Sequence, residues 1–251
     1  MHWLPDGIAF DRAAEYYDRT RVLPDDIVAR QTTMLMAEIT GAARVLEIGV
    51  GTGRIAVTLD VPVVGLDLSR PMMDVLRTKT DAIPLVEADA TRLPLLDACF
   101  DAAYAAHVFH LIPTWETALA ELVRVVRPGG VILAVRGSGA TDVEREMNAA
   151  ISIRSRPVGA HTIEDIDDGA RRLGLGVRAL DAITWTVPTK LRTQVEAVRQ
   201  GIWSGMWDRT PAELDDLADQ VEVWATERYG SVDLDVPATS SFTWHAYDVP
   251  S

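Results

Sequence analysis

The chain has 251 residues, of which 48% are apolar, so it can bury a full hydrophobic core as one large domain or as a core with an inserted cap. Its 37 acidic residues outnumber the 24 basic ones and give a net charge of −13, which disfavours binding along a nucleic-acid backbone. Cys99 is the only cysteine, which excludes an intramolecular disulfide and a cysteine-rich metal site and suits a reducing cytoplasm. The sequence has neither an export signal nor an apolar run long enough to cross a bilayer, so we expect a cytoplasmic protein without membrane contact.

Helical and strand patterns alternate along the chain, which predicts an α/β fold with a mostly parallel sheet and helices on both faces. Apolar runs bounded by turn residues predict strands at residues 43–48, 62–66, 84–87, 100–106, 130–136, 177–187 and 241–249. Apolar residues at helical spacing, together with capping residues, predict helices at residues 25–39, 114–126, 162–174, 190–206 and 211–229.

The most informative stretch runs from Val45 to Arg54, where an apolar strand is followed by three alternate glycines, Gly49, Gly51 and Gly53. Glycine is needed where φ turns positive or where a ligand approaches the backbone, so we interpret the stretch as a strand that turns into a helix over a nucleotide-like ligand. The alternative is a tight turn without a ligand. A dinucleotide fingerprint would place its last glycine where this chain has Arg54.

Three acidic residues accompany this loop. Glu47 lies inside the apolar strand, where a lone carboxylate is costly, so it implies a cationic or hydrogen-bonding partner. Asp67 ends the second predicted strand, where a carboxylate can accept from both ribose hydroxyls; the alternative is a helix N-cap, a role for which Ser69 competes. Asp89 ends the third predicted strand and could accept from an adenine amino group, or it could be an ordinary loop acid.

Together with the fourth strand, which ends before His107, and with the helix stop at Pro128-Gly129-Gly130, these elements resemble a class I S-adenosylmethionine (SAM)-dependent methyltransferase. The resemblance is to the small-molecule type found in ubiquinone and menaquinone biosynthesis, and it covers roughly residues 8–136. It implies a Rossmann-like, doubly wound, mostly parallel seven-stranded sheet with an antiparallel last strand.

We therefore expect residues 1–251 to form a single domain with three parts: a core at about 25–187 plus 240–251, an N-terminal entrance segment at 1–24, and a helical insertion at about 188–239. The insertion either caps the substrate or covers one edge of the sheet.

The resemblance also implies SAM as the cofactor. The residues that it implies around SAM are Tyr17, Glu47, Gly49, Gly51, Gly53, Asp67, Leu68, Met72, Asp89, Ala90 and His107. Glu47 and the glycines would surround the methionine part and Asp67 the ribose. Leu68, Met72, Asp89 and Ala90 would contact the adenine. Tyr16 and Tyr17 belong to an entrance segment that covers cofactor and substrate in the family.

Methyl transfer needs alignment more than side-chain chemistry, although a base helps when the acceptor is protonated. His107 and His110 are the candidate bases, and the alternative is that they cap a strand or are satisfied in the core. The family commonly has two adjacent histidines here, whereas this chain has Phe109 before His110. No His, Asp or Glu cluster has convincing ligand spacing, so we expect no catalytic metal.

Trp203 and Trp207 are four residues apart in a predicted helix and could form an aromatic wall for a small-molecule acceptor, or simply pack in the core. The predicted function is transfer of a methyl group from SAM to an O, N or C atom of a small metabolite. An aromatic metabolite would suit such a wall. Two alternatives stay open, a SAM-binding module without catalysis and an NAD-dependent oxidoreductase. The sequence leaves the acceptor and the oligomeric state open.

Overall fold

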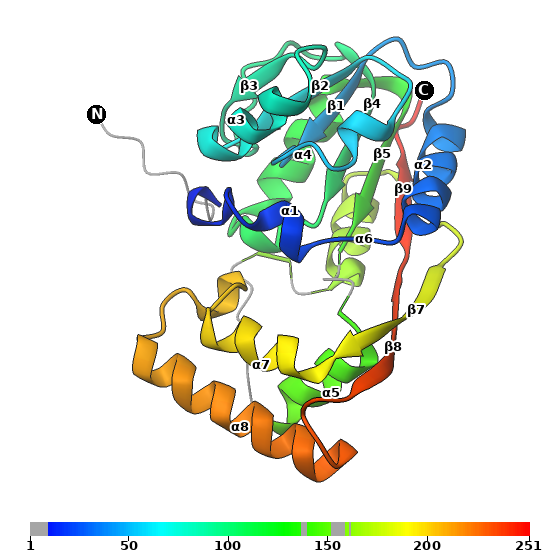
Figure 1. The fold of residues 1–251 in the computed structure, drawn as a ribbon. Helices are drawn as coiled ribbons and strands as arrows, with labels where there is room; N and C mark the ends of the chain where they lie inside the picture. Colours follow the sequence, from blue (N-terminus) through cyan, green and yellow to red (C-terminus); the bar gives the residue numbers. More distant parts are fainter. Residues whose placement is uncertain (1–9, 137–139, 152–158, 161) are drawn as a thin grey trace. The chain divides into compact units, whose positions relative to one another are not determined.

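The computed structural model describes residues 10–136, 140–151, 159–160 and 162–251, which divide into two compact units (Figure 1). Unit 1 comprises residues 1–137, 158–183 and 243–251, and unit 2 comprises residues 138–157 and 184–242. Unit 2 thus contains the predicted insertion together with a helix from the middle of the chain. Residues 1–9 of the predicted entrance segment lie outside the described part.

Unit 1 is built on a seven-stranded sheet. Its strands are β1 (Val45–Ile48), β2 (Val63–Asp67), β3 (Leu85–Glu87), β4 (Phe100–Ala106), β5 (Val126–Val135), β6 (Gly176–Ala179) and β9 (Trp244–Asp248). Their order is β3-β2-β1-β4-β5-β9-β6, with β1 to β5 mutually parallel and β9 antiparallel to both of its neighbours. The predicted fold class, including the antiparallel last strand, is confirmed.

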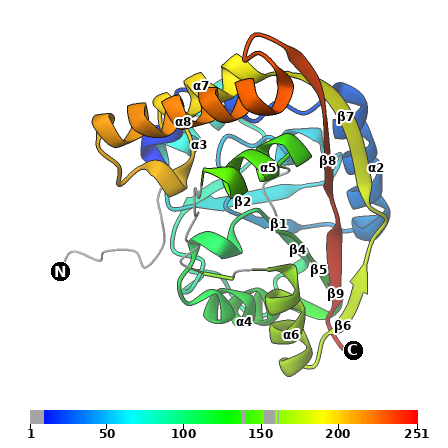
Figure 2. The same ribbon diagram turned by 90° about the horizontal axis from the view of Figure 1, so that it is seen from below.

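Helices cover both faces of this sheet. All four residues of the inner strand β1, whose side chains point alternately to the two faces, are therefore buried. The helical elements of unit 1 are η1 (Asp11–Ala13), α1 (Tyr17–Thr20), α2 (Asp25–Ile39), η2 (Ala56–Thr58), α3 (Arg70–Lys79), η3 (Phe109–Leu111), α4 (Trp115–Val125) and α6 (Ile163–Arg172). Leu46, Leu119, Ile166 and Tyr247 belong to one core cluster, which joins α4 and α6 to the sheet. Figure 2 shows α4 and α6 side by side on one face.

Unit 2 contains α5 (Asp142–Ala150), β7 (Ile183–Lys190), α7 (Leu191–Arg199), η4 (Ser204–Met206), α8 (Pro211–Tyr229) and β8 (Asp235–Phe242). β7 and β8 form a separate two-stranded sheet, and α5, α7 and α8 share a core of their own that includes Met147, Val195 and Leu217. Helix α8 begins with the Thr210 capping box and ends at Gly230 (φ +90°), as its sequence predicts. None of the helices in the described ranges is long and apolar enough to cross a membrane.

Several sequence predictions differ from the structure in detail. Strand β5 begins at Val126, so it contains the Pro128-Gly129-Gly130 stretch that was expected to precede it. The predicted strand 177–187 is divided between β6 and β7, and the predicted strand 241–249 between β8 and β9. These strands belong to different sheets, because an extended pattern does not specify its hydrogen-bonding partner. The predicted helix 190–206 ends at Arg199, and Gly201 follows with φ +59°.

A buried polar network links α6 to β9 and has a testable contribution to stability. Asp167 is 7% exposed; it accepts a hydrogen bond from the Tyr247 hydroxyl (3.0 Å) and lies 2.9 Å from His245 Nδ1. We expect Asp167→Ala to lower the free energy of unfolding by about 2 to 4 kcal/mol, because it leaves two polar partners buried and unpaired.

Urea denaturation measures this change. The matched control is Asp168→Ala, which removes an exposed carboxylate whose one ion pair within the described residues is with Arg171 on the same helix, and it should change stability by no more than about 0.5 kcal/mol. Equal effects of the two substitutions would contradict a stabilising role for the network.

Candidate active site

The predicted glycine loop lies at the carboxyl end of β1 and depends on glycine at each of its three positions. Gly49, Gly51 and Gly53 have φ values of +69°, +52° and +75°. A Cβ at Gly49 would lie 2.8 Å from Val108 Cγ2, and one at Gly53 would lie 2.3 Å from Leu76 Cδ1. The loop therefore combines left-handed backbone with close packing from neighbouring elements.

The loop is not followed by an α-helix, and this part of the prediction is wrong. Between the loop and β2 the structure has the 3₁₀ turn η2 (Ala56–Thr58) and no α-helix. The N–H groups available at this point therefore belong to the loop itself and not to the N-terminus of an α-helix.

Asp67 is the last residue of β2, and its carboxylate organises the loop. Asp67 Oδ2 accepts from Gly51 N (2.7 Å), and Oδ1 accepts from Ser69 N (2.8 Å). Burial raises the pKa of Asp67, although N–H donors from Ser69, Gly51 and Leu68 oppose that shift. Ser69 is the side-chain N-cap of α3, through its contact with Met72 N at 3.3 Å. The N-cap role is thus filled by Ser69, and the three N–H donors leave the Asp67 carboxylate with acceptor capacity for another donor.

Asp89 follows β3 and carries an unsatisfied acceptor. Its Oδ1 accepts from both Thr91 N and Thr91 Oγ1 at 2.8 Å, while Oδ2 is buried and accepts no hydrogen bond from any described residue. The N–H of Ala88 donates to Asp67 O (3.1 Å), so the ends of β2 and β3 are joined directly. A buried carboxylate oxygen without a donor is costly, and a ligand amino group would satisfy it.

Glu47 and Tyr104 form a buried pair within the sheet, on β1 and β4. Tyr104 OH donates to Glu47 Oε2 at 2.7 Å, and the two residues are 2% and 1% exposed. Burial raises the pKa of Glu47 well above its ordinary value of 4.5, which the Tyr104 hydrogen bond opposes and the Asp67 charge reinforces. The hydrogen-bonding partner that the sequence implied for Glu47 is therefore Tyr104.

The raised pKa gives a signed prediction for Glu47→Gln. Between the unfolded and the folded pKa of Glu47, the folded state holds a proton that the unfolded state has lost, so stability falls as the pH rises. This contribution is fully present below about pH 4.5 and is lost as the pH approaches the folded pKa. Glutamine cannot titrate, so the stability of the wild type relative to the variant should fall by up to about 1.4 kcal/mol per pH unit above pH 4.5.

Urea denaturation of both proteins at pH 5, 6 and 7 measures this difference. A stability difference that stays constant with pH would show that Glu47 titrates normally in the folded protein.

The two histidines lie just beyond β4 in different environments. His107 has φ +54°, a left-handed conformation that is rare outside glycine, and its N–H donates to Val135 O at 2.9 Å. Such strain concentrates at functional sites. Burial lowers the pKa of His110 to about 3, helped by the nearby His107 and Arg136, and its Nδ1 is buried without a partner among the described residues. His110 is therefore a neutral imidazole at pH 7.

The N-terminal segment packs against the glycine loop. Asp18 in α1 accepts from Thr52 Oγ1 (2.6 Å) and pairs with Lys79 Nζ (2.6 Å). Tyr17 is hydrogen-bonded to the half-buried Arg54, which directly follows the last glycine. The structure thus places Tyr17 beside Arg54 at the end of the loop, and its contact with the cofactor stays a prediction, as does the substrate contact of Tyr16.

Trp203 and Trp207 both belong to unit 2, where they flank the short turn η4 and do not share an α-helix. Trp203 packs against the core cluster of unit 2, which favours the packing alternative for that residue. The other tryptophans are scattered: Trp244 lies in the core of unit 1 against Tyr104, and Trp185 pairs with Phe242.

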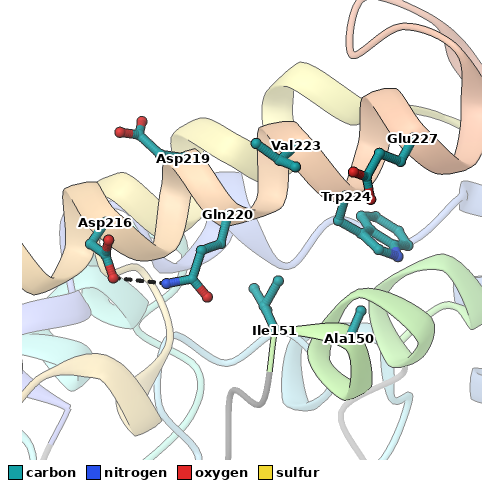
Figure 3. Close-up of a pocket in the computed structure, with 8 residues that line it drawn as sticks. All are labelled: Ala150, Ile151, Asp216, Asp219, Gln220, Val223, Trp224 and Glu227. Carbon is teal, nitrogen blue, oxygen red and sulfur yellow. Dashed lines mark hydrogen bonds between the residues drawn. The ribbon is translucent and has the colours of Figure 1, made fainter.

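Unit 2 also has a surface hollow of about 440 Å³ between the end of α5 and the outer side of α8 (Figure 3). Its lining combines Trp224 and Val223 with acidic side chains, among which Asp216 accepts from Gln220 Nε2 at 2.7 Å. None of the predicted cofactor or catalytic residues lines it, so it is separate from the glycine-loop site.

Several residues of the site were missed by sequence reasoning. They are Asp18, Thr52, Arg54 as a partner of Tyr17, Lys79 and Val108. Their only sequence signal is position, because Thr52 lies between two of the glycines and Asp18 directly follows Tyr17 in the segment expected to cover the site.

Comparisons with known proteins agree with this geometry. Residues 46–134 match the family model described as a methyltransferase domain. The chain is 33% identical over 138 residues to a demethylmenaquinone methyltransferase of Thermus thermophilus, a match that covers 50% of this chain and 63% of the relative. It is 37% identical over 128 residues to a malonyl-[acyl-carrier protein] O-methyltransferase of Serratia marcescens, a match that covers 50% of this chain and 49% of the relative.

Among solved structures, the YcgJ protein of Bacillus subtilis is similar at a TM-score of 0.61 with 15% identity, covering 91% of this chain and 100% of that one. This likeness concerns the fold. The sheet order, the glycine loop and the matched family model agree with one another: residues 46–134 are similar to a methyltransferase domain, and the chain spans less than two thirds of the length of the two curated relatives named above.

Proposed function

We propose that this chain transfers a methyl group from SAM to an O, N or C atom of a small metabolite. The observation that carries the proposal is the set of unsatisfied acceptors at one edge of the sheet. Asp67 ends β2, and Asp89 lies two residues beyond the end of the neighbouring parallel strand β3. Asp67 retains acceptor capacity, and Asp89 Oδ2 is buried and has no donor among the described residues. A ribose diol and an adenine amino group supply the donors that this edge lacks.

The remaining cofactor residues fit the same ligand. Met72 is buried with its Cε 3.2 Å from the Cβ position of Gly51, which places an apolar side chain beside the loop next to Leu68. Glu47 and the three glycines would face the methionine part. An NAD-dependent oxidoreductase is disfavoured, because Arg54 occupies the place of the last fingerprint glycine.

SAM supplies a methyl group already activated on a sulfonium. The protein must therefore hold the acceptor in line with that group and exclude water. Tyr17 contributes to exclusion as part of the segment packed on the loop. His110, with a pKa of about 3, is too weak a base to deprotonate a hydroxyl or an ammonium group, so His107 is the better candidate where a proton must be accepted.

We assign acceptor selection to the residues outside the cofactor set, with unit 2 as a substrate cap that includes Trp203 and Trp207. The two relatives act, by name, on different acceptors, although both match this chain over about half its length. The net charge of −13 favours a small metabolite over a nucleic acid as the acceptor. The single cysteine suits the reducing conditions of the cytoplasm, which we propose as the location of the protein.

The test is isothermal titration of the purified protein with SAM, S-adenosylhomocysteine and NADH in parallel. We expect micromolar binding of the two adenosyl-sulfur ligands, on the order of −8 kcal/mol, and none of NADH. Binding of NADH alone would overturn the proposal. Transfer of a labelled methyl group across a panel of acceptors then separates an enzyme from a SAM-binding module, which would bind the cofactor and methylate nothing.

A further inference from the structure

Three residues, Asp18, Thr52 and Lys79, connect the N-terminal segment to the glycine loop, and each of them contacts the other two. Asp18 Oδ1 accepts from Thr52 Oγ1 and Asp18 Oδ2 pairs with Lys79 Nζ, each at 2.6 Å. Lys79 Nζ also donates to Thr52 O at 2.7 Å. The set joins the N-terminal segment, the glycine loop and the last residue of α3.

The three side chains of this set differ in burial and charge. Thr52 is 1% exposed, whereas the side chains of Asp18 and Lys79 are 37% and 32% exposed. Burial acts to raise the pKa of Asp18, but the hydrogen bonds from Lys79 and Thr52 outweigh it and lower the pKa overall. Asp18 is therefore ionised at neutral pH. An ion pair that is one-third exposed is weak enough to open and close repeatedly.

The same segment reaches both ends of the cofactor-binding residues. At one end, Asp18 contacts Thr52 between two of the loop glycines. At the other end, η1 packs against α3, and the charge of Asp11 is close enough to raise the pKa of Asp67. Residues 11–18 thus approach both the glycine loop and Asp67, the two places where the cofactor is expected to be held.

In the family that this chain resembles, the entrance segment covers the cofactor, and we call residues 10–21 of this segment the lid. We propose that Asp18 is the latch of the lid, which holds it against the glycine loop through Thr52 and Lys79. Asp18 acts as a positioning residue for the lid. The inference rests on the proposed function for the identity of the ligand, whereas the contacts of the latch are independent of it.

The first experiment measures how fast S-adenosylhomocysteine dissociates, by stopped-flow fluorescence. In Asp18→Ala we expect the dissociation rate to rise about tenfold, the scale of losing one charge-assisted hydrogen bond. Added salt should accelerate dissociation from the wild type but not from the variant, since only the wild type has the ion pair. Asp26→Ala is the matched control, because it removes an exposed carboxylate on α2 close by in the sequence.

The double variant Asp18→Lys with Lys79→Asp provides a rescue, because it restores an ion pair of reversed polarity. Its dissociation rate should be slower than that of Asp18→Lys alone. A dissociation rate in Asp18→Ala within twofold of the wild type, with no salt dependence in either, would overturn the latch.

A second readout does not depend on the cofactor. Trypsin can cleave after Arg19 and Arg21 within the lid, and we expect faster cleavage there in Asp18→Ala and Asp18→Asn than in the wild type or in Asp26→Ala. Equal cleavage rates would overturn the latch. If the wild type binds neither SAM nor S-adenosylhomocysteine, the proposed function fails, and the trypsin comparison still decides whether Asp18 closes the segment.

Discussion

Gly53→Ala should remove cofactor binding and lower stability more than any other substitution in the glycine loop. The new methyl group would lie 2.3 Å from Leu76 Cδ1 and 3.1 Å from Leu76 Cγ, and Leu76 is completely buried. The backbone at Gly53 is also left-handed, with φ +75°. Strain and overpacking together should lower the free energy of unfolding by about 2 to 5 kcal/mol.

Gly41→Ala separates these two causes. Gly41 has nearly the same backbone conformation, with φ +80°, but no atom lies within 4 Å of its Cβ position. The free energy of unfolding of Gly41→Ala should therefore fall only by the cost of the left-handed backbone, about 1 to 2 kcal/mol, and this variant should keep its cofactor affinity. Urea denaturation and SAM titration of both variants provide the comparison. Equal losses in the two variants would show that contact with Leu76 is unimportant.

The parts of the fold that the sequence predicts well are those determined by local residues. The glycine loop follows β1 and Asp67 ends β2, as expected, whereas Asp89 lies two residues beyond the end of β3. Alternate glycines have few alternative conformations, which makes the loop predictable from local residues. Helix α8 was bounded correctly by the Thr210 capping box and Gly230 for the same reason.

The parts that the sequence does not predict depend on partners that are remote in the chain. The pattern of residues 177–187 correctly indicates extended backbone, but the division into β6 and β7 depends on β9 and β8 near the C-terminus. Likewise, Asp18 and Lys79 are ordinary surface residue types, and only the fold brings them to Thr52. The division into two units arises from separate cores, which no single segment specifies.

Asp67→Ala should weaken SAM binding by about 1 to 3 kcal/mol, the scale of losing hydrogen bonds to a charged group. Isothermal titration measures this loss, and unchanged affinity would refute a role for Asp67 in the ribose site. Asp67 also accepts from the N–H groups of Gly51 and Ser69, so part of the loss could come from a loosened loop and not from a missing ligand contact.

An analogue of S-adenosylhomocysteine that lacks the ribose hydroxyls distinguishes these two causes through a double-mutant cycle between protein and ligand. If Asp67 binds the hydroxyls, the wild type loses affinity for the analogue, whereas Asp67→Ala binds both ligands equally. If Asp67 acts only on the loop, the substitution weakens both ligands by the same factor and the cycle has no coupling. Asp67 retains acceptor capacity, so we expect a positive coupling energy with the ribose hydroxyls. Because its two oxygens also hold backbone donors of the loop, we expect this coupling energy to be smaller than the total loss of affinity.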